Sequence, residues 1–139
     1  MDIGHTIETP NIITYSSMVS RNSMCIGLLL AYLHGVGITS NYMENLYLNS
    51  PCAEKIWFIG GNECGEDKGR VLPIFRALYC LKYSGFLCRS DLAAALRGIW
   101  LNPTVADPNV WIREAMRLDG WDYCELLLVY IDYIMIVSN

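Results

Sequence analysis

Residues 124–137 read CELLLVYIDYIMIV; after Glu125 the stretch is apolar except for Asp132, which interrupts it. The run is too long for one ordinary strand, because strands average about 5–6 residues. It predicts a β-hairpin whose turn lies near Ile131 and Asp132. Burying an unpaired charge is costly, and metal binding at a tight turn would be one reason for Asp132 to stand there.

Two further segments predict helices. The first runs from about Ser20 to Leu33, where Ser17 or Ser20 can cap its start and Gly35 can end it. Its apolar residues at helical spacing are expected to face the core: Ile26, Leu29, Leu30 and Leu33. The second helix is expected at 86–100, with Leu92, Leu96 and Ile99 on one face and Asn102-Pro103 breaking it.

Short runs rich in β-branched and aromatic residues predict the strands, at 36–42, 55–59, 71–75 and 110–113. An acidic loop is expected at 63–69 and a turn at 118–120. Two helices mixed with about four to six strands predict an α+β domain. No periodicity is visible in residues 1–16, so we expect an irregular arm there, followed by one unit from 17 to 139.

The composition excludes several classes of protein. Hydrophobic residues make up 53% of the 139 residues and charged residues 17%, which excludes disorder and a highly charged nucleic-acid tail. A membrane helix needs about 20 apolar residues, but 24–33 is too short and Asp132 interrupts 126–137. The first residues carry no secretory signal, so we expect an intracellular protein, cytoplasmic or nuclear, with no membrane partner.

The six cysteines show no metal-binding spacing: none of them forms a Cys-x-x-Cys pair, and neither histidine lies near a pair. We therefore expect no zinc and mostly buried free thiols.

Positive charge gathers in the middle of the chain. From 68 to 97 there are six bases and one acid, Asp91, for a net charge of +5: Lys68, Arg70, Arg76, Lys82, Arg89 and Arg97. Such a region can bind a polyanion such as nucleic acid. An ordinary solvated face is the alternative interpretation of the same charges.

The hairpin stretch resembles the Tyr-x-Asp-Asp hairpin of reverse transcriptases. Three other segments occur in the order found in the copia-type retrotransposon branch of that family. Residues 38–51, with Tyr47-Leu48-Asn49, resemble its first catalytic strand and the segment after that strand. Residues 76–82 (RALYCLK) resemble its Leu-Tyr-Gly-Leu-Lys motif, with Cys80 in place of glycine, and 103–111, containing Ala106-Asp107-Pro108, resemble the segment before the hairpin. The resemblance covers about 17–139.

This resemblance implies the palm and part of the fingers of a right-handed polymerase, with the catalytic-type hairpin in an antiparallel sheet packed on helices. The family's activity is RNA-directed DNA polymerisation, a nucleotidyl transfer that uses two Mg²⁺ ions held by three aspartates. A template–primer of RNA or DNA and a deoxynucleoside triphosphate would be the partners. The thumb, the RNase H domain and the other polyprotein domains are expected to be absent from this chain.

The chain departs from the family at the positions that hold metal. Tyr42 aligns with the first catalytic aspartate and Tyr133 with the second aspartate of the hairpin, so only Asp132 remains as a metal ligand. A phenol is neutral at pH 7 and a poor Mg²⁺ ligand. Glu44 would share the face of Tyr42 if the strand continued, but it would have to reach past the Tyr42 ring. We therefore expect no productive Mg²⁺ binding and no polymerase activity.

Other family positions carry over to the nucleotide and the template. Tyr47 matches the aromatic residue that screens the sugar 2′ position, and a buried core tyrosine is the alternative. Lys82 matches the motif lysine that contacts the nucleotide, although Tyr83-Ser84-Gly85 replaces the usual Gln-Ala-Pro. Arg76 and Arg89 are expected to meet template phosphates. The alternatives to an inactive polymerase fragment are a non-catalytic nucleic-acid-binding module that uses 68–97, or a relic with no function.

Overall fold

The computed structural model describes residues 17–79, 81 and 83–139. They form two compact units: residues 17–44 together with 92–139 make the larger unit, and residues 45–91 make the smaller one. The sequence predicted one continuous unit from residue 17. The mixed α+β class is confirmed, while the predicted N-terminal arm lies outside the described residues.

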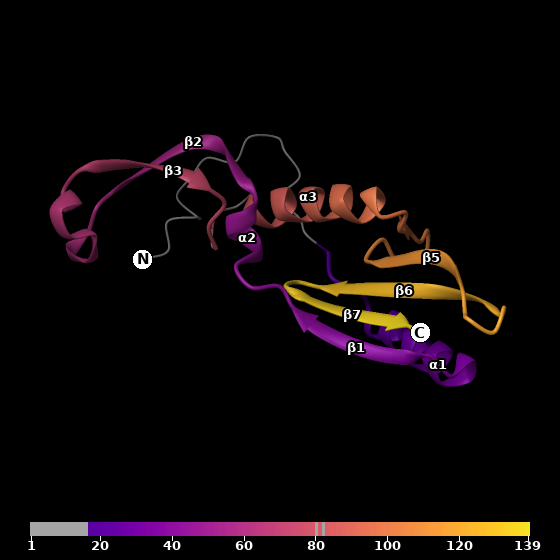
Figure 1. The fold of residues 1–139 in the computed structure, drawn as a ribbon. Coiled ribbons are helices and arrows are strands. Elements are labelled where there is room, and N and C mark those ends of the chain that lie inside the picture. Colours follow the sequence, from indigo (N-terminus) through magenta and orange to yellow (C-terminus); the bar gives the residue numbers. More distant parts are fainter. Residues whose placement is uncertain (1–16, 80, 82) are drawn as a thin grey trace. The chain divides into compact units, whose positions relative to one another are not determined.

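The larger unit contains an antiparallel sheet of five strands in the order β1-β7-β6-β5-β4 (Figure 1). Strands β6 and β7 form the predicted hairpin, in which Tyr130 pairs with Tyr133 across the turn at Ile131 and Asp132. The strands are β1 (Gly37–Tyr42), β4 (Asn102–Pro103), β5 (Val110–Met116), β6 (Asp122–Tyr130) and β7 (Tyr133–Ser138).

The apolar run at residues 126–129 of β6 is explained by burial on both faces of the sheet. Leu126 and Leu128 point to the face covered by α1 (Arg21–His34). Leu127 and Val129 point to the other face, where they pack with Leu92, Ala93 and Leu96 from the second half of α3 (Ser84–Gly98). A strand covered on both sides loses the usual alternation of apolar and polar residues.

Helix α1 begins and ends as predicted, but the prediction of its buried face was wrong. The Ser20 hydroxyl accepts a hydrogen bond from the Ser23 N–H at 3.0 Å, and Gly35 ends the helix at a φ of 61°. The buried residues are Gly27 and Ala31, while the predicted core residues Ile26, Leu29 and Leu33 are exposed. Small side chains let the helix lie close to the sheet, since a Cβ at Gly27 would stand 3.3 Å from a Leu128 methyl.

The smaller unit is built on a two-stranded antiparallel ribbon. Strand β2 (Pro51–Ile59) pairs with β3 (Val71–Arg76), and the predicted loop between them contains a 3-10 helix, η2 (Asn62–Asp67). A short helix, α2 (Leu46–Asn49), precedes the ribbon.

Three local predictions were wrong. The described residues form seven strands rather than four to six, partly because Asn102 and Pro103, expected only to break a helix, pair with β5. Ile99, expected on the buried face of α3, lies after the helix end at Gly98 and is exposed. The five described cysteines are free, as expected, but of these only Cys88 is buried. Cys25, on α1, and Cys124, near the start of β6, are exposed.

Within the described residues, no helix combines the length and the hydrophobicity that a membrane crossing requires.

Candidate functional site at the β6–β7 turn

The register of β1 and β7 places Tyr42 directly opposite Tyr133, although the two residues lie far apart in the sequence. Their ring centroids are 5.1 Å apart, and the ring planes are tilted by 48°. Immediately after β1, the Met43 N–H donates a hydrogen bond of 2.7 Å to the backbone carbonyl of Asp132. The sheet therefore assembles Tyr42, Asp132 and Tyr133, three positions singled out by the resemblance, around the hairpin turn.

The hairpin turn itself adds a third tyrosine and a strained residue. Tyr130 is paired with Tyr133, which in turn is paired with Tyr42, so the three side chains emerge from one face of the sheet. Each of these tyrosines is about half exposed. Ile131 has a φ of 53°, a left-handed conformation that is unusual for a β-branched residue.

The set of metal ligands at this turn is small. Asp132 is half-buried and is the carboxylate of the turn, while the two neighbouring positions carry phenols. Glu44 does not take their place on the sheet, because β1 ends at Tyr42. Across the described residues, no group of three histidine, cysteine, aspartate or glutamate side chains is arranged to hold a metal ion. One carboxylate beside two phenol side chains does not fit a pair of Mg²⁺ ions, which take oxygen ligands and are usually bridged by several carboxylates.

The other predicted site residues belong to the smaller unit or to the undescribed positions. Tyr47 lies in α2, is half-buried and packs on Tyr79 with ring centroids 4.4 Å apart. Arg76 ends β3, is exposed, and its Nη1 donates to the Asn49 carbonyl at 3.2 Å. Arg89 is half-buried on α3, and Lys82 lies outside the described residues.

The predicted basic region is divided between the two units. Arg70 forms an ion pair with Asp67 at 2.9 Å in the smaller unit. Arg97 lies in the larger unit, where its guanidinium stands 5.5 Å from the centre of the Trp111 ring. Arg70 and Arg97 therefore have partners within their own units. This arrangement is typical of a solvated protein surface and does not distinguish it from a site that binds a polyanion.

A carboxylate to which the sequence assigned no role holds part of the larger unit together. Asp107 is 8% exposed, and its side chain accepts hydrogen bonds from the Ser20 N–H at 2.9 Å and the Ser23 hydroxyl at 2.7 Å. It also accepts from the Asn109 N–H at 3.0 Å and from the Asn109 Nδ2 at 3.3 Å. Burial raises the pKa of Asp107, but these hydrogen bonds outweigh it and lower the pKa to about 2.

The Asp107 contacts tie the start of α1 to the connection between β4 and β5. The local pattern from Thr104 to Asn109 is the signal that the sequence offers for part of this role, since aspartate readily bonds the backbone N–H two residues later. The partners Ser20 and Ser23 are far away in the sequence, and no spacing connects them to Asp107.

A second polar network lies on the α3 face of the sheet. The Arg113 guanidinium donates to Glu125 through both Nε and Nη2, and the Ser138 hydroxyl donates to the same carboxylate at 2.7 Å. Burial raises the pKa of Glu125, but hydrogen bonds from Ser138 and Arg113 and the charge of Arg113 lower it overall. Since every member has a partner, this network is a structural one.

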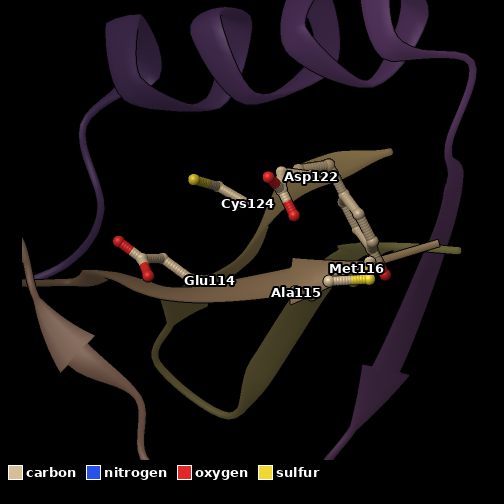
Figure 2. Close-up of a pocket in the computed structure, with 6 residues that line it drawn as sticks. Glu114, Ala115, Met116, Asp122 and Cys124 are labelled. Atoms are coloured by element: carbon tan, nitrogen blue, oxygen red, sulfur yellow. The ribbon is translucent and has the colours of Figure 1, made fainter. Parts of the chain in front are cut away.

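An open groove of about 560 Å³ lies on the β5–β6 pair, where Glu114, Asp122 and Cys124 project to the same side (Figure 2). Asp122 begins β6 and Tyr130 ends it, and eight residues of extended chain span about 27 Å. The carboxylates of this groove are therefore too far away to complete the set of ligands at the hairpin turn.

Known proteins offer no assignment for this site. Comparisons with protein-family models, with curated proteins and with solved structures each gave no match to the chain.

Proposed function

We propose that this chain is a palm-type fragment of the copia-type reverse transcriptase lineage that no longer transfers nucleotides. The observation that carries the proposal is the cross-strand pairing of Tyr42 with Tyr133 beside Asp132. The positions at which the resemblance expects three catalytic carboxylates meet at one turn, and two of them carry phenols. In this proposal the three positions descend from an acidic cluster of which Asp132 is the remaining acid.

The arrangement of secondary structure supports the palm assignment. The hairpin lies inside an antiparallel sheet with β1 on one side and β5 on the other, and helices pack on both faces. The smaller unit, with its β2–β3 ribbon, would correspond to part of the fingers.

The loss of activity follows from the chemistry of the ligands. Nucleotidyl transfer by two metal ions needs anionic oxygens that hold both ions about 4 Å apart. Here the Tyr42 and Tyr133 rings pack on each other beside the turn, and among the described residues of the turn Asp132 is the one that carries a carboxylate. Since this set of residues does not fit two Mg²⁺ ions, we derive no catalytic step for this chain.

The test combines activity with metal binding. We expect no primer extension by the full chain with Mg²⁺ or Mn²⁺ on an RNA or a DNA template. In the double variant Tyr42→Asp/Tyr133→Asp, we expect Mn²⁺ binding at least about tenfold tighter than in the unmodified chain, measured by electron paramagnetic resonance. Adding Asp132→Asn to the double variant serves as the matched control and should remove that gain. Robust nucleotide incorporation by the unmodified chain would contradict the proposal.

Nucleic-acid binding without catalysis is the second candidate, and the exposure of Lys68, Arg76 and Arg97 favours it. Phosphate contacts release counterions, so the affinity for a nucleic acid would fall steeply with salt. Charge reversal at Arg76 and Arg89 should abolish such binding, whereas Arg21→Glu on the exposed side of α1 should leave it unchanged. If the unmodified chain shows no salt-dependent binding, this candidate is wrong, and a chain that also fails to unfold cooperatively would be a relic with no function.

A further inference from the structure

The larger unit also contains an apolar cavity of about 260 Å³ on the α1 side of the sheet, which is partly open to solvent because Ser40, Tyr130 and Tyr133 in its lining are exposed. Its walls come from the first turns of α1 and from three neighbouring strands. The residues that matter for what it can bind are Met24, Ser40, Leu128, Tyr130, Tyr133 and Met135. Apolar surface dominates the lining, and Ser40 and the two tyrosines are the lining residues that carry hydroxyl groups.

The cavity arises from the way in which α1 approaches the sheet. At Gly27 the helix backbone lies close to the sheet, because an added Cβ would stand 3.3 Å from a Leu128 methyl and 3.6 Å from the Met135 methyl. One turn earlier the helix carries Met24, and the facing position on β1 is occupied by Ser40, whose side chain is short. The space that a larger residue at position 40 would fill therefore stays open.

The size and the lining of this cavity select one class of ligand. A dry apolar cavity of about 150 Å³ accommodates benzene, so the larger volume here suits a bicyclic ring. Thioether sulfurs and tyrosine rings make favourable contacts with aromatic rings. The few hydroxyls match a ring with one polar group, whereas a nucleobase would bring several polar edges into an apolar space at a cost.

We propose that this cavity binds a neutral bicyclic aromatic ring with a single N–H or O–H group, of which indole is the simplest example. The inference does not depend on the polymerase ancestry, since it uses only the cavity walls. It does connect to the hairpin turn, because Tyr133 both lines the cavity and packs on Tyr42.

The test is a titration of the full chain, labelled at its methionine methyl groups, with indole as the probe. We expect saturable shifts at Met24 and Met135, assigned through Met24→Leu and Met135→Leu, and little change at the exposed Met18 and Met116. A parallel titration with adenosine monophosphate should give no saturable shift at these two methyls. Ser40→Phe, which fills the cavity, should weaken indole binding by at least about tenfold.

Thr39→Phe is the matched control, because neighbouring positions on β1 face opposite sides of the sheet. It should bind indole like the unmodified chain. Circular dichroism establishes that each variant is folded, and Ser40→Leu replaces Ser40→Phe if the larger residue prevents folding. The proposal is overturned if indole shifts all methionines alike without saturation, if filling the cavity leaves binding intact, or if adenosine monophosphate binds there instead.

Discussion

Asp107 and Asp132 are both aspartates of the larger unit, but their surroundings differ. Asp107 is buried and its carboxylate accepts hydrogen bonds from Ser20, Ser23 and Asn109. Asp132 lies in a turn between strands, and the sheet holds it through its backbone carbonyl, which accepts from the Met43 N–H. Asp107 is held by hydrogen bonds to its side chain, whereas Asp132 is held by a hydrogen bond to its main chain.

Under the proposed ancestry, this difference explains how the fold could be kept while the site loses its catalytic activity. Beside Asp132, the rings of Tyr42 and Tyr133 pack on each other across the strands. Around Asp107, replacing the acid would leave several polar groups without an acceptor. We therefore expect substitutions at the turn to disturb the sheet and α1 less than substitutions at Asp107 do.

The largest expected effect is on Asp107. Asp107→Ala should lower the free energy of unfolding by about 3 kcal/mol, because it removes the acceptor of the part-buried Ser20 and Ser23 donors and of the buried Asn109 donors. Asp132→Ala, the matched control, should change it by less than about 0.5 kcal/mol. Urea denaturation followed by circular dichroism measures both. Equal losses in the two variants would show that the two aspartates do not differ in the way that their contacts indicate.

The next effect is a dependence of stability on pH. The pKa of Asp107 is lowered to about 2 from an ordinary value of 3.8, so its ionised form stabilises the folded state above about pH 4. That contribution, about 2 kcal/mol, should be lost as the pH falls from about 4 to 2. Glu125, whose pKa is also lowered, contributes a loss of the same sign.

Comparison with the Asp107→Asn variant isolates the contribution of Asp107 to the loss of stability at acid pH. The variant should lose less stability than the unmodified chain over the same acid range, since its residue 107 no longer titrates while Glu125 still does. Denaturation curves at about pH 5 and 2.5 test this, and parallel losses in the two proteins would rule out Asp107 as the source.

The sequence predicted those parts of the larger unit that depend on local patterns. A long apolar run with one central carboxylate required a hairpin, and the structure has the turn at Ile131 and Asp132. Serine before an apolar helix and glycine after it marked both ends of α1. The meeting of Tyr42 with Tyr133 was implied only by the family resemblance, because no local pattern fixes the register of strands so distant in the sequence.

The sequence failed where the tertiary arrangement decides the outcome. Helical periodicity assigned the large residues Ile26 and Leu29 to the core, but close contact with the sheet selected Gly27 and Ala31 instead. The role of Asp107 depends on donors on a distant helix start, which no spacing rule connects to it. Hydrophobicity alone ranks side chains by burial and does not determine which face of a helix touches its neighbour.

A smaller effect concerns the two tyrosines of the turn. If the Tyr42–Tyr133 contact stabilises the sheet, a double-mutant cycle with Tyr42→Leu and Tyr133→Leu should give a coupling energy of about 1 kcal/mol. Chemical denaturation of the four proteins measures it. Thr39→Leu in place of Tyr42→Leu provides the control, since residue 39 faces the other side of β1. A coupling energy near zero would mean that the rings merely occupy the site.

The smallest effect lies at Ile131 and has the opposite sign. Its φ of 53° costs energy for a β-branched residue, and its side chain is 45% exposed, so little packing depends on it. Ile131→Asn should raise the free energy of unfolding by about 0.5 kcal/mol, because asparagine tolerates the left-handed conformation. Ile131→Val keeps the branched Cβ and should give no gain. A loss of stability in the asparagine variant would show that the isoleucine side chain supports the turn through packing. The hairpin turn would then depend on its side chains, contrary to the contrast drawn with Asp107.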